Sequence, residues 1–331
     1  MGIINKGANP MSLVLSVVDP MYKHDICLTE LVHDSSLMER TIKYAEMNGL
    51  YYPFLSRIFE LDPTISQLGG KRWERELNDL NDLKNTLTFL GDLHDRDGID
   101  YILIKACTTI PHVPRDVDIF IHENQKDKIR AIFDRNNMKV LYSNNVETSF
   151  NRNGYMKLDI YGKIRYISKE FIDENYLWRS RVVGNLFGID CVVLNNEANF
   201  LLLFIHGLFG HRCITLLDFL NMNNIIRNIE AVDVCRAYST LHGWGYVFDM
   251  GLNRLTHLQK LIYDDGMQVP FPYLFDRKFV LRCITSIDDL QLSEKEMFYL
   301  NLSLNMDRIS YELRKSPLYD YLKPSCLARH P

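Results

Sequence analysis

The chain has 331 residues, of which 47% are hydrophobic and 24% are charged. These proportions are typical of a folded protein, and a chain of this length is expected to divide into two or three units. A formal net charge of −4 excludes a protein whose main task is to coat nucleic acid, although a local basic surface is compatible with it.

The first hundred residues are predicted to be helical. The strongest pattern runs from Arg72 to Asp97, where leucines recur at steps of three and four residues and form one apolar stripe. Gly98 follows, and glycine readily adopts the positive φ that ends many helices. The stripe is expected to be core packing, and it consists of Leu77, Leu80, Leu83, Leu87, Leu90 and Leu93.

A sheet is predicted after Gly98, because helical periodicity gives way to short apolar runs. A buried strand at 100–104 is followed by a polar segment and a second strand at 115–121. A helix at 124–137, strands at 138–142, 148–150, 156–161 and 164–167, and a hairpin of 182–183 with 189–194 come next. This order predicts an α/β (α+β) fold with a small mixed sheet.

The chain is predicted to become helical again from Asn195. Asn196 starts a very apolar helix that reaches about Gly210, and Thr215 starts another. We therefore expect an N-terminal helical region at 1–98, an α/β core at 99–194 and a C-terminal helical domain at 195–331.

Three aspartates form the most informative pattern. Strand alternation at 115–121 places Asp116 and Asp118 on one face and apolar residues on the other. Asp159 alternates with apolar neighbours in the same way at 156–161. If the two strands are adjacent, the carboxylates need a cation between them, and their hard oxygen atoms favour Mg²⁺ or Mn²⁺. The alternative is the solvated face of an edge strand.

The order of these pieces resembles the nucleotidyltransferase superfamily that includes DNA polymerase beta. The closer likeness is to uncharacterised prokaryotic nucleotidyltransferases related to abortive-infection toxins. It covers roughly residues 45–225. It rests on Leu103-Ile104-Lys105-Ala106, Arg115-Asp116-Val117-Asp118-Ile119, Asp159, and His206-x-x-x-x-His211 followed by Leu216-Leu217-Asp218-Phe219-Leu220.

The resemblance implies a metal-dependent enzyme that moves a nucleoside monophosphate from a nucleoside triphosphate (NTP) to a hydroxyl acceptor. Asp116, Asp118 and Asp159 would be its catalytic residues and would hold Mg²⁺ or Mn²⁺, with two metals clamping an in-line displacement. Asp159 is also expected to orient the acceptor hydroxyl or accept its proton. The acceptor would be an RNA end, a protein side chain or a small molecule.

One part of the family pattern is altered. The superfamily usually has glycine-serine at the turn that grips the triphosphate, and Ala106-Cys107 stands there in this chain. The expected NTP-binding set is therefore Lys105, Thr108, Thr109 and Arg115, with the threonine hydroxyls at a helix start that favours anions. The alternative is a catalytically degenerate protein that kept this fold but lost triphosphate binding and acts as a binding or regulatory module, for example in a toxin–antitoxin system.

The two histidines of the resemblance are expected to pack or to form hydrogen bonds rather than to bind a metal. His206 and His211 are five residues apart, so on an α-helix they would not share a face. Asp218 is expected to be a buried partner for one of these histidines or for Arg212.

No pattern indicates secretion, a membrane or a structural zinc site. The seven cysteines are scattered without a C-x-x-C pair, so neither a disulfide framework nor a zinc site is expected. The longest apolar run, at 200–209, is too short to cross a bilayer. We expect a cytoplasmic protein without a signal peptide or a membrane partner.

Overall fold

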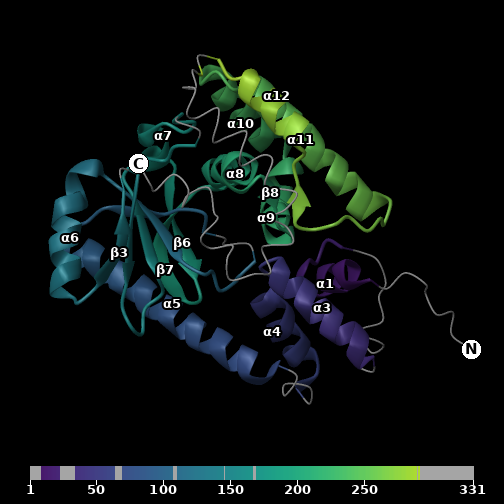
Figure 1. Ribbon diagram of the computed structural model, residues 1–331, viewed down its shortest axis with the longest axis horizontal. Helices are drawn as coiled ribbons and strands as arrows, with labels where there is room; N and C mark the ends of the chain where they lie inside the picture. Colours follow the sequence, from purple (N-terminus) through teal and green to yellow (C-terminus); the bar gives the residue numbers. More distant parts are fainter. Residues whose placement is uncertain are drawn as a thin grey trace, which may run out of the picture.

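A seven-stranded mixed sheet lies beside a large group of helices (Figure 1). The computed structural model describes residues 9–22, 34–63, 69–106, 110–144, 146–166, 169–288 and 290. The strands are β1 (Tyr101–Leu103), β2 (Val117–Ile121), β3 (Lys139–Ser143), β4 (Glu147–Asn151), β5 (Leu158–Tyr161), β6 (Arg181–Leu186) and β7 (Ile189–Leu194), in the order β3-β4-β5-β2-β1-β7-β6. The predicted mixed sheet flanked by helices is confirmed.

Strand pairing brings distant segments together. β2 is parallel to β5 and β1 is parallel to β7, whereas the other neighbouring strands are antiparallel. The prediction of a strand at 164–167 is wrong for residues 164–166, the part of it that the structure describes. Of these residues, only Tyr166 has a strand-like pairing, an isolated bridge to Lys169. Both edges of β5 are already paired, with β2 and β4, so this segment has no free place beside β5 in the sheet.

Helices make up most of the rest of the described chain, and none of them is long and apolar enough to cross a membrane. The N-terminal helices are α1 (Pro10–Val18), α3 (Ser35–Met47), α4 (Tyr51–Leu61) and α5 (Gly70–Asp97). Within the sheet region lie η2 (Glu123–Gln125), α6 (Lys126–Arg135) and α7 (Glu174–Arg179). The C-terminal elements are α8 (Asn196–Ile205), η3 (His206–His211), β8 (Cys213–Ile214), α9 (Leu216–Ile226), α10 (Ile229–Leu241), α11 (Gly245–Gln259), η4 (Lys260–Asp264), β9 (Tyr273–Leu274) and α12 (Arg277–Thr285).

The long helix α5 confirms the helix predicted at 72–97. Its leucine stripe is buried except for Leu77, which is 39% exposed, because the hydrophobic cluster that covers the stripe begins at Leu80. Gly98 has a φ of 59° and caps the helix in the left-handed conformation. Each buried leucine contributes about 2 kcal/mol, so the stripe holds α5 firmly against the sheet.

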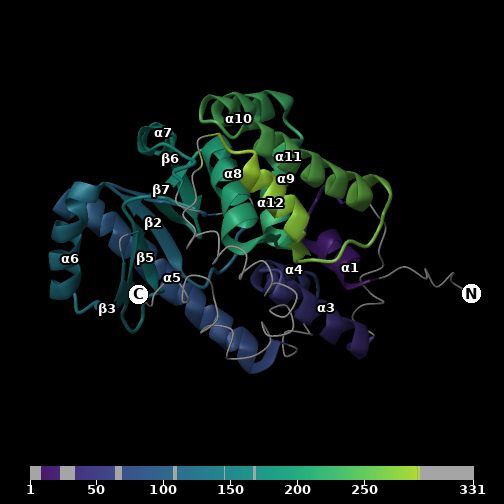
Figure 2. The same ribbon diagram turned by 45° about the horizontal axis from the view of Figure 1, so that its top comes forward.

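The two faces of the sheet belong to different hydrophobic clusters. One cluster joins α5 and α6 to the face that carries Val117 and Ile119. The other joins α1, α3, α4 and the C-terminal helices to the face that carries Ile102 and Phe120. Figure 2 shows α8 to α12 gathered apart from α5 and α6. Because β2 alternates between the clusters, Asp118 lies on the face that meets the C-terminal helices.

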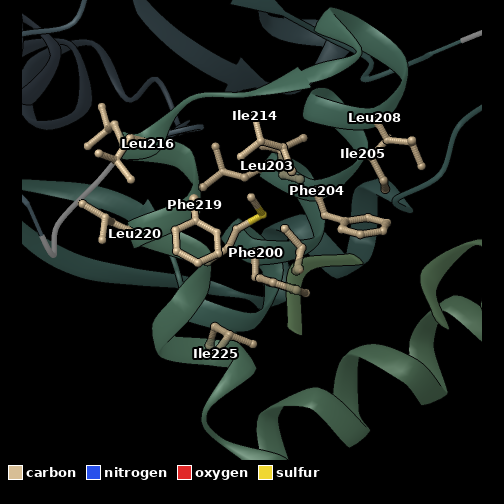
Figure 3. Packing of buried hydrophobic residues seen from close by; sticks show 14 of the residues in the cluster. Phe200, Leu203, Phe204, Ile205, Leu208, Ile214, Leu216, Phe219, Leu220 and Ile225 are labelled. Atoms are coloured by element: carbon tan, nitrogen blue, oxygen red, sulfur yellow. The ribbon is translucent and has the colours of Figure 1, made fainter. Parts of the chain in front are cut away.

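The C-terminal helices have an aromatic and aliphatic core of their own. Figure 3 shows the region between α8 and α9, where the side chains of Phe200, Leu203 and Phe219 gather. The same cluster contains residues of α1, α3 and α4, so it extends across the boundaries predicted near 98 and 195. The division of the chain at those two positions remains a prediction.

Candidate functional site

Asp118 and Asp159 lie side by side on adjacent strands. β2 and β5 run parallel, and Asp118 is the register partner of Asp159. Leu158 and Ile160 are buried in the cluster behind the sheet, so Asp159 points to the face that carries Asp118. The side chains of Asp118 and Asp159 are 11% and 5% exposed. The structure thus brings two predicted site residues together in a nearly buried position.

Lys157 connects the third aspartate to this pair. Its Nζ lies 2.8 Å from Oδ2 of Asp159 and 3.0 Å from Oδ2 of Asp116. Burial alone would lower the pKa of Lys157, but its interactions with Asp159 and Asp116 outweigh burial and raise it. A single ammonium group therefore bridges two carboxylates at neutral pH.

Lys105 contacts Asp118 from the turn after β1. Its Nζ lies 2.9 Å from Oδ1 of Asp118 and 5.1 Å from the centre of the Tyr161 ring. Its φ is 58°, a conformation that costs a residue with a side chain about 1–2 kcal/mol. Burial alone would lower the pKa of Lys105, but the Asp118 carboxylate raises it above its usual value. Lys105, predicted to bind phosphate, is here a charged partner of Asp118.

Strand β4 supports Asp159 from the other side. Ser149 is fully buried opposite Asp159, and its Oγ donates a hydrogen bond to Oδ1 of that residue. Glu147 also hydrogen-bonds Asp159 and accepts a hydrogen bond from the hydroxyl of Tyr142. Burial and the nearby Asp159 raise the pKa of Glu147 to about 7. The site therefore contains a fourth carboxyl group, which is partly protonated near neutral pH.

The donor chemistry of this cluster fits a divalent cation. Mg²⁺ and Mn²⁺ prefer carboxylate oxygens, and Lys157 marks a point at which one cation contacts Asp116 and Asp159 together. Burial raises the pKa of Asp118, and the like charges of Asp116 and Asp159 raise it further, whereas the charge of Lys105 lowers it. A cation bound beside Asp118 would therefore stabilise its ionised form.

The positions of the side chains show what a metal would have to displace. Within the described residues no group of three His, Cys, Asp or Glu side chains is arranged to hold a metal ion. Instead, the ammonium group of Lys157 lies between Asp116 and Asp159, and that of Lys105 contacts Asp118. The side chain of Lys157 is 32% exposed, so water is available to it if a metal takes its place.

A tyrosine and two histidines connect this site to the C-terminal helices. Tyr166 Oη lies 2.9 Å from Nδ1 of His206. Burial raises the pKa of Tyr166 to about 12. Burial and the charge of Lys105 lower the pKa of His206 well below its usual value. The rings of His206 and His211 are 4.3 Å apart, because η3 is a π-helix. The prediction that their spacing separates them assumed an α-helix and is wrong.

The other predicted residues have different positions. Arg115 is exposed, and among the described residues its guanidinium group has no ion-pair partner. Thr108 and Thr109 lie outside the described residues. Asp218 accepts hydrogen bonds from the backbone nitrogen and hydroxyl of Thr215, which form the capping box of α9. Asp218 thus has a structural role at a helix start.

A pocket of about 100 Å³ lies beside the carboxylates. Lys105, Asp116 and Asp118 line it together with leucines of α5 and with Phe187 of the β6–β7 hairpin. This space has room for several water molecules. A small polar group can therefore enter the pocket beside the carboxylates.

Sequence reasoning did not assign roles to Lys157, Ser149 or Glu147. Lys157 lies two residues before Asp159, so strand alternation already places both on one face, and this signal was available. Ser149 and Glu147 share a face of their own strand for the same reason. Only the pairing of β4 with β5 shows that this face meets Asp159.

Comparisons with known proteins give distant structural similarities. No family model and no curated protein matches the chain, so none supports the predicted relation to abortive-infection toxins. The lincosamide antibiotic adenylyltransferase LnuA with bound lincomycin is 17% identical, with a TM-score of 0.34, over 44% of this chain and 96% of that chain. The antibiotic-resistance factor ANT(2'')-Ia is 12% identical, with a TM-score of 0.32, over 55% of this chain and 95% of that chain. Both are nucleotidyltransferase-fold proteins.

Proposed function

We propose that the protein is a metal-dependent nucleotidyltransferase that moves a nucleoside monophosphate from an NTP to a hydroxyl acceptor. The observation that carries the proposal is the register of β2 and β5, which sets Asp118 beside Asp159 while Lys157 bridges Asp159 to Asp116. Buried charges in such an arrangement add little stability compared with apolar residues of similar size. Their concentration on one face is therefore better explained by chemistry than by folding.

Each residue of the site has a defined part in this proposal. Asp116, Asp118 and Asp159 would hold the metal, with Ser149 fixing one oxygen of Asp159 so that the other faces the cation. When bound, Mg²⁺ would neutralise the charge that develops on the phosphate oxygens during displacement. The guanidinium of Arg115, which is exposed, would pair with the triphosphate, since its planar donors match phosphate oxygens.

A catalytically inactive binding module is the second candidate, and the two lysines favour it. Lys105 and Lys157 between them pair with all three aspartates, so much of the negative charge is compensated without a metal. Ala106 also stands where the superfamily has glycine. A protein of this kind would keep the fold without binding the triphosphate or transferring a nucleotide.

Incubation with each α-³²P-labelled NTP and Mg²⁺ tests both candidates, with total RNA or small hydroxyl compounds as acceptors. We expect label on one acceptor class, reduced at least about 100-fold by Asp118→Asn because the metal site is disrupted. Asp134→Asn, on the exposed surface of α6, is the matched control and should be fully active. If there is no transfer and no NTP-dependent rise in melting temperature, the transferase is contradicted and the inactive module remains. A rise in melting temperature without transfer would mean that the site binds NTP and that the acceptor is missing.

A further inference from the structure

Among the residues that the structure describes, His112 is the remaining ionisable side chain that lines the pocket beside the carboxylates. It lies between β1 and β2, and its Nδ1 is 3.3 Å from the backbone oxygen of Ile110. A carbonyl oxygen only accepts hydrogen bonds, so Nδ1 carries the proton of the neutral ring and Nε2 carries a lone pair. Nε2 has no hydrogen-bond partner among the residues that the structure describes. His112 therefore offers an unengaged proton acceptor.

Asp159, the residue expected to receive the proton of the acceptor hydroxyl, is poorly placed to do so. Its side chain is 5% exposed and does not line the pocket. Both of its oxygens have partners, with Ser149 at Oδ1 and Lys157 at Oδ2. A hydroxyl group that enters the pocket has access to His112 instead.

We propose that His112 is a catalytic residue of the transferase and that its Nε2 accepts the proton of the acceptor hydroxyl. This inference rests on the proposed function. The acceptor oxygen forms a bond to the α-phosphorus as its proton passes to Nε2. The bond between the α-phosphorus and the oxygen that bridges to the β-phosphate breaks, and pyrophosphate leaves with its electron pair. The imidazolium then returns its proton to water, so no further reactant is needed.

The surroundings of His112 keep its ring available for this step. Burial lowers the pKa of His112, and the hydrogen bond to Ile110 opposes this effect. Within the described part of the chain, the charged groups that line the pocket with it are Lys105, Asp116 and Asp118, whereas α5 and the β6–β7 hairpin contribute apolar side chains. At neutral pH most of the protein therefore carries His112 in the unprotonated form that accepts a proton.

His112→Asn tests the role of the ring nitrogen, because the amide can still donate to Ile110 but offers no acceptor at the position of Nε2. The rate of α-phosphate transfer, or of hydrolysis with water as the acceptor, should fall about 100-fold. The melting-temperature rise caused by the Mg²⁺-bound NTP should not change. His94→Asn is the matched control, since Nδ1 of His94 also lies 3.3 Å from a backbone oxygen, that of Ile99, at the end of α5. His112→Gln replaces the asparagine variant if that variant does not fold.

Two further measurements separate catalysis from packing. The wild-type rate should fall at acid pH with a midpoint below 6.5, the ordinary pKa of histidine, and this acid limb should be absent from His112→Asn. Diethyl pyrocarbonate, which acylates unprotonated imidazole, should modify His112 in the wild-type protein. Mg²⁺ and NTP together should slow that modification, as followed by peptide mass spectrometry.

The outcomes distinguish failure of this inference from failure of the proposed function. Equal rates and pH profiles in wild type and His112→Asn would overturn the role of His112 and leave the transferase intact. Loss of the NTP-dependent melting shift in His112→Asn would make His112 a nucleotide-binding residue and would also overturn its role as proton acceptor. A wild-type protein that neither transfers nor hydrolyses any NTP would overturn the transferase and, with it, the role of His112.

Discussion

Replacing Lys157 with methionine should destabilise the protein, because two carboxylates lose their shared cation. The side chain of Asp159 is 5% exposed, whereas those of Lys157 and Asp116 are 32% and 37% exposed. Removing one partner of a buried pair costs about 3–5 kcal/mol, and removing one partner of an exposed pair costs about 0.2–1 kcal/mol. The bridge is intermediate between these cases. The expected loss of unfolding free energy is therefore about 2 kcal/mol without metal.

Mg²⁺ should reverse this loss if it binds in place of the ammonium group. In Lys157→Met the ion has no ammonium to displace, so it should bind more tightly than in the wild-type protein. A ligand at about 100 times its dissociation constant adds about 2.7 kcal/mol to the free energy of unfolding, enough to offset the deficit. Urea unfolding at neutral pH, in EDTA and in MgCl₂, measures both effects.

Lys126→Met is the matched control for charge removal. Lys126 lies 2.8 Å from Glu123, and their side chains are 31% and 51% exposed, so its loss should cost at most about 0.5 kcal/mol and should not respond to Mg²⁺. If Lys157→Met is as stable as wild type in EDTA, or if Mg²⁺ affects both variants equally, then Lys157 does not occupy the place of a metal.

The stabilisation by Lys157 has a defined pH range. Burial alone would lower its pKa, but the interactions with Asp159 and Asp116 raise the folded-state pKa above 10.5, the value expected for the unfolded chain. A raised pKa means that the contribution is complete below pH 10.5 and is lost as the pH rises through the folded-state pKa. The difference in stability between wild type and Lys157→Met should be constant from neutral pH to about pH 10 and should shrink at higher pH.

Three further substitutions test individual contacts by chemical denaturation. Ser149→Ala removes a buried hydroxyl that donates to a carboxylate and should cost about 1–3 kcal/mol, whereas Ser143→Ala on the exposed end of β3 should cost less than about 0.5 kcal/mol. Lys105→Gly should be more stable than Lys105→Ala by about 1 kcal/mol, because both lose the ion pair and only glycine is relaxed at a φ of 58°. Gly251→Ala in α11 would place Cβ inside a phenylalanine ring of α8 and should cost about 1–3 kcal/mol, whereas Gly91→Ala in α5 has open space and should gain up to about 1 kcal/mol. If the two variants of any pair change the free energy of unfolding equally, the contact described for that pair does not contribute to stability.

Some features of the candidate site were predictable from sequence because they depend on local periodicity. Alternation in the strand at 115–121 placed Asp116 and Asp118 on one face, and β2 packs its apolar residues into a cluster on the other face. The leucine spacing of α5 and the glycine after it likewise predicted the helix and its end. Each of these inferences uses only neighbours within a few residues, whose relative positions are set by helix or strand geometry.

Other features depended on which residues meet across the fold. The register that sets Asp118 beside Asp159 arises from the pairing of β2 with β5, whose segments are far apart in the chain. The π-helical turn that brings the rings of His206 and His211 edge to face could not be deduced from their spacing. In an α-helix, residues five positions apart do not share a face.

The sequence by itself predicted the helix α5, the strand β2 with the face of Asp118, and the class of chemistry that we propose for the carboxylates. Only the tertiary structure showed that Lys105 and Lys157 pair with those carboxylates, and that His112 lines the adjacent pocket. Side-chain periodicity is a property of the local backbone. Ion-pair partners, burial and accessible space are set by packing between distant segments.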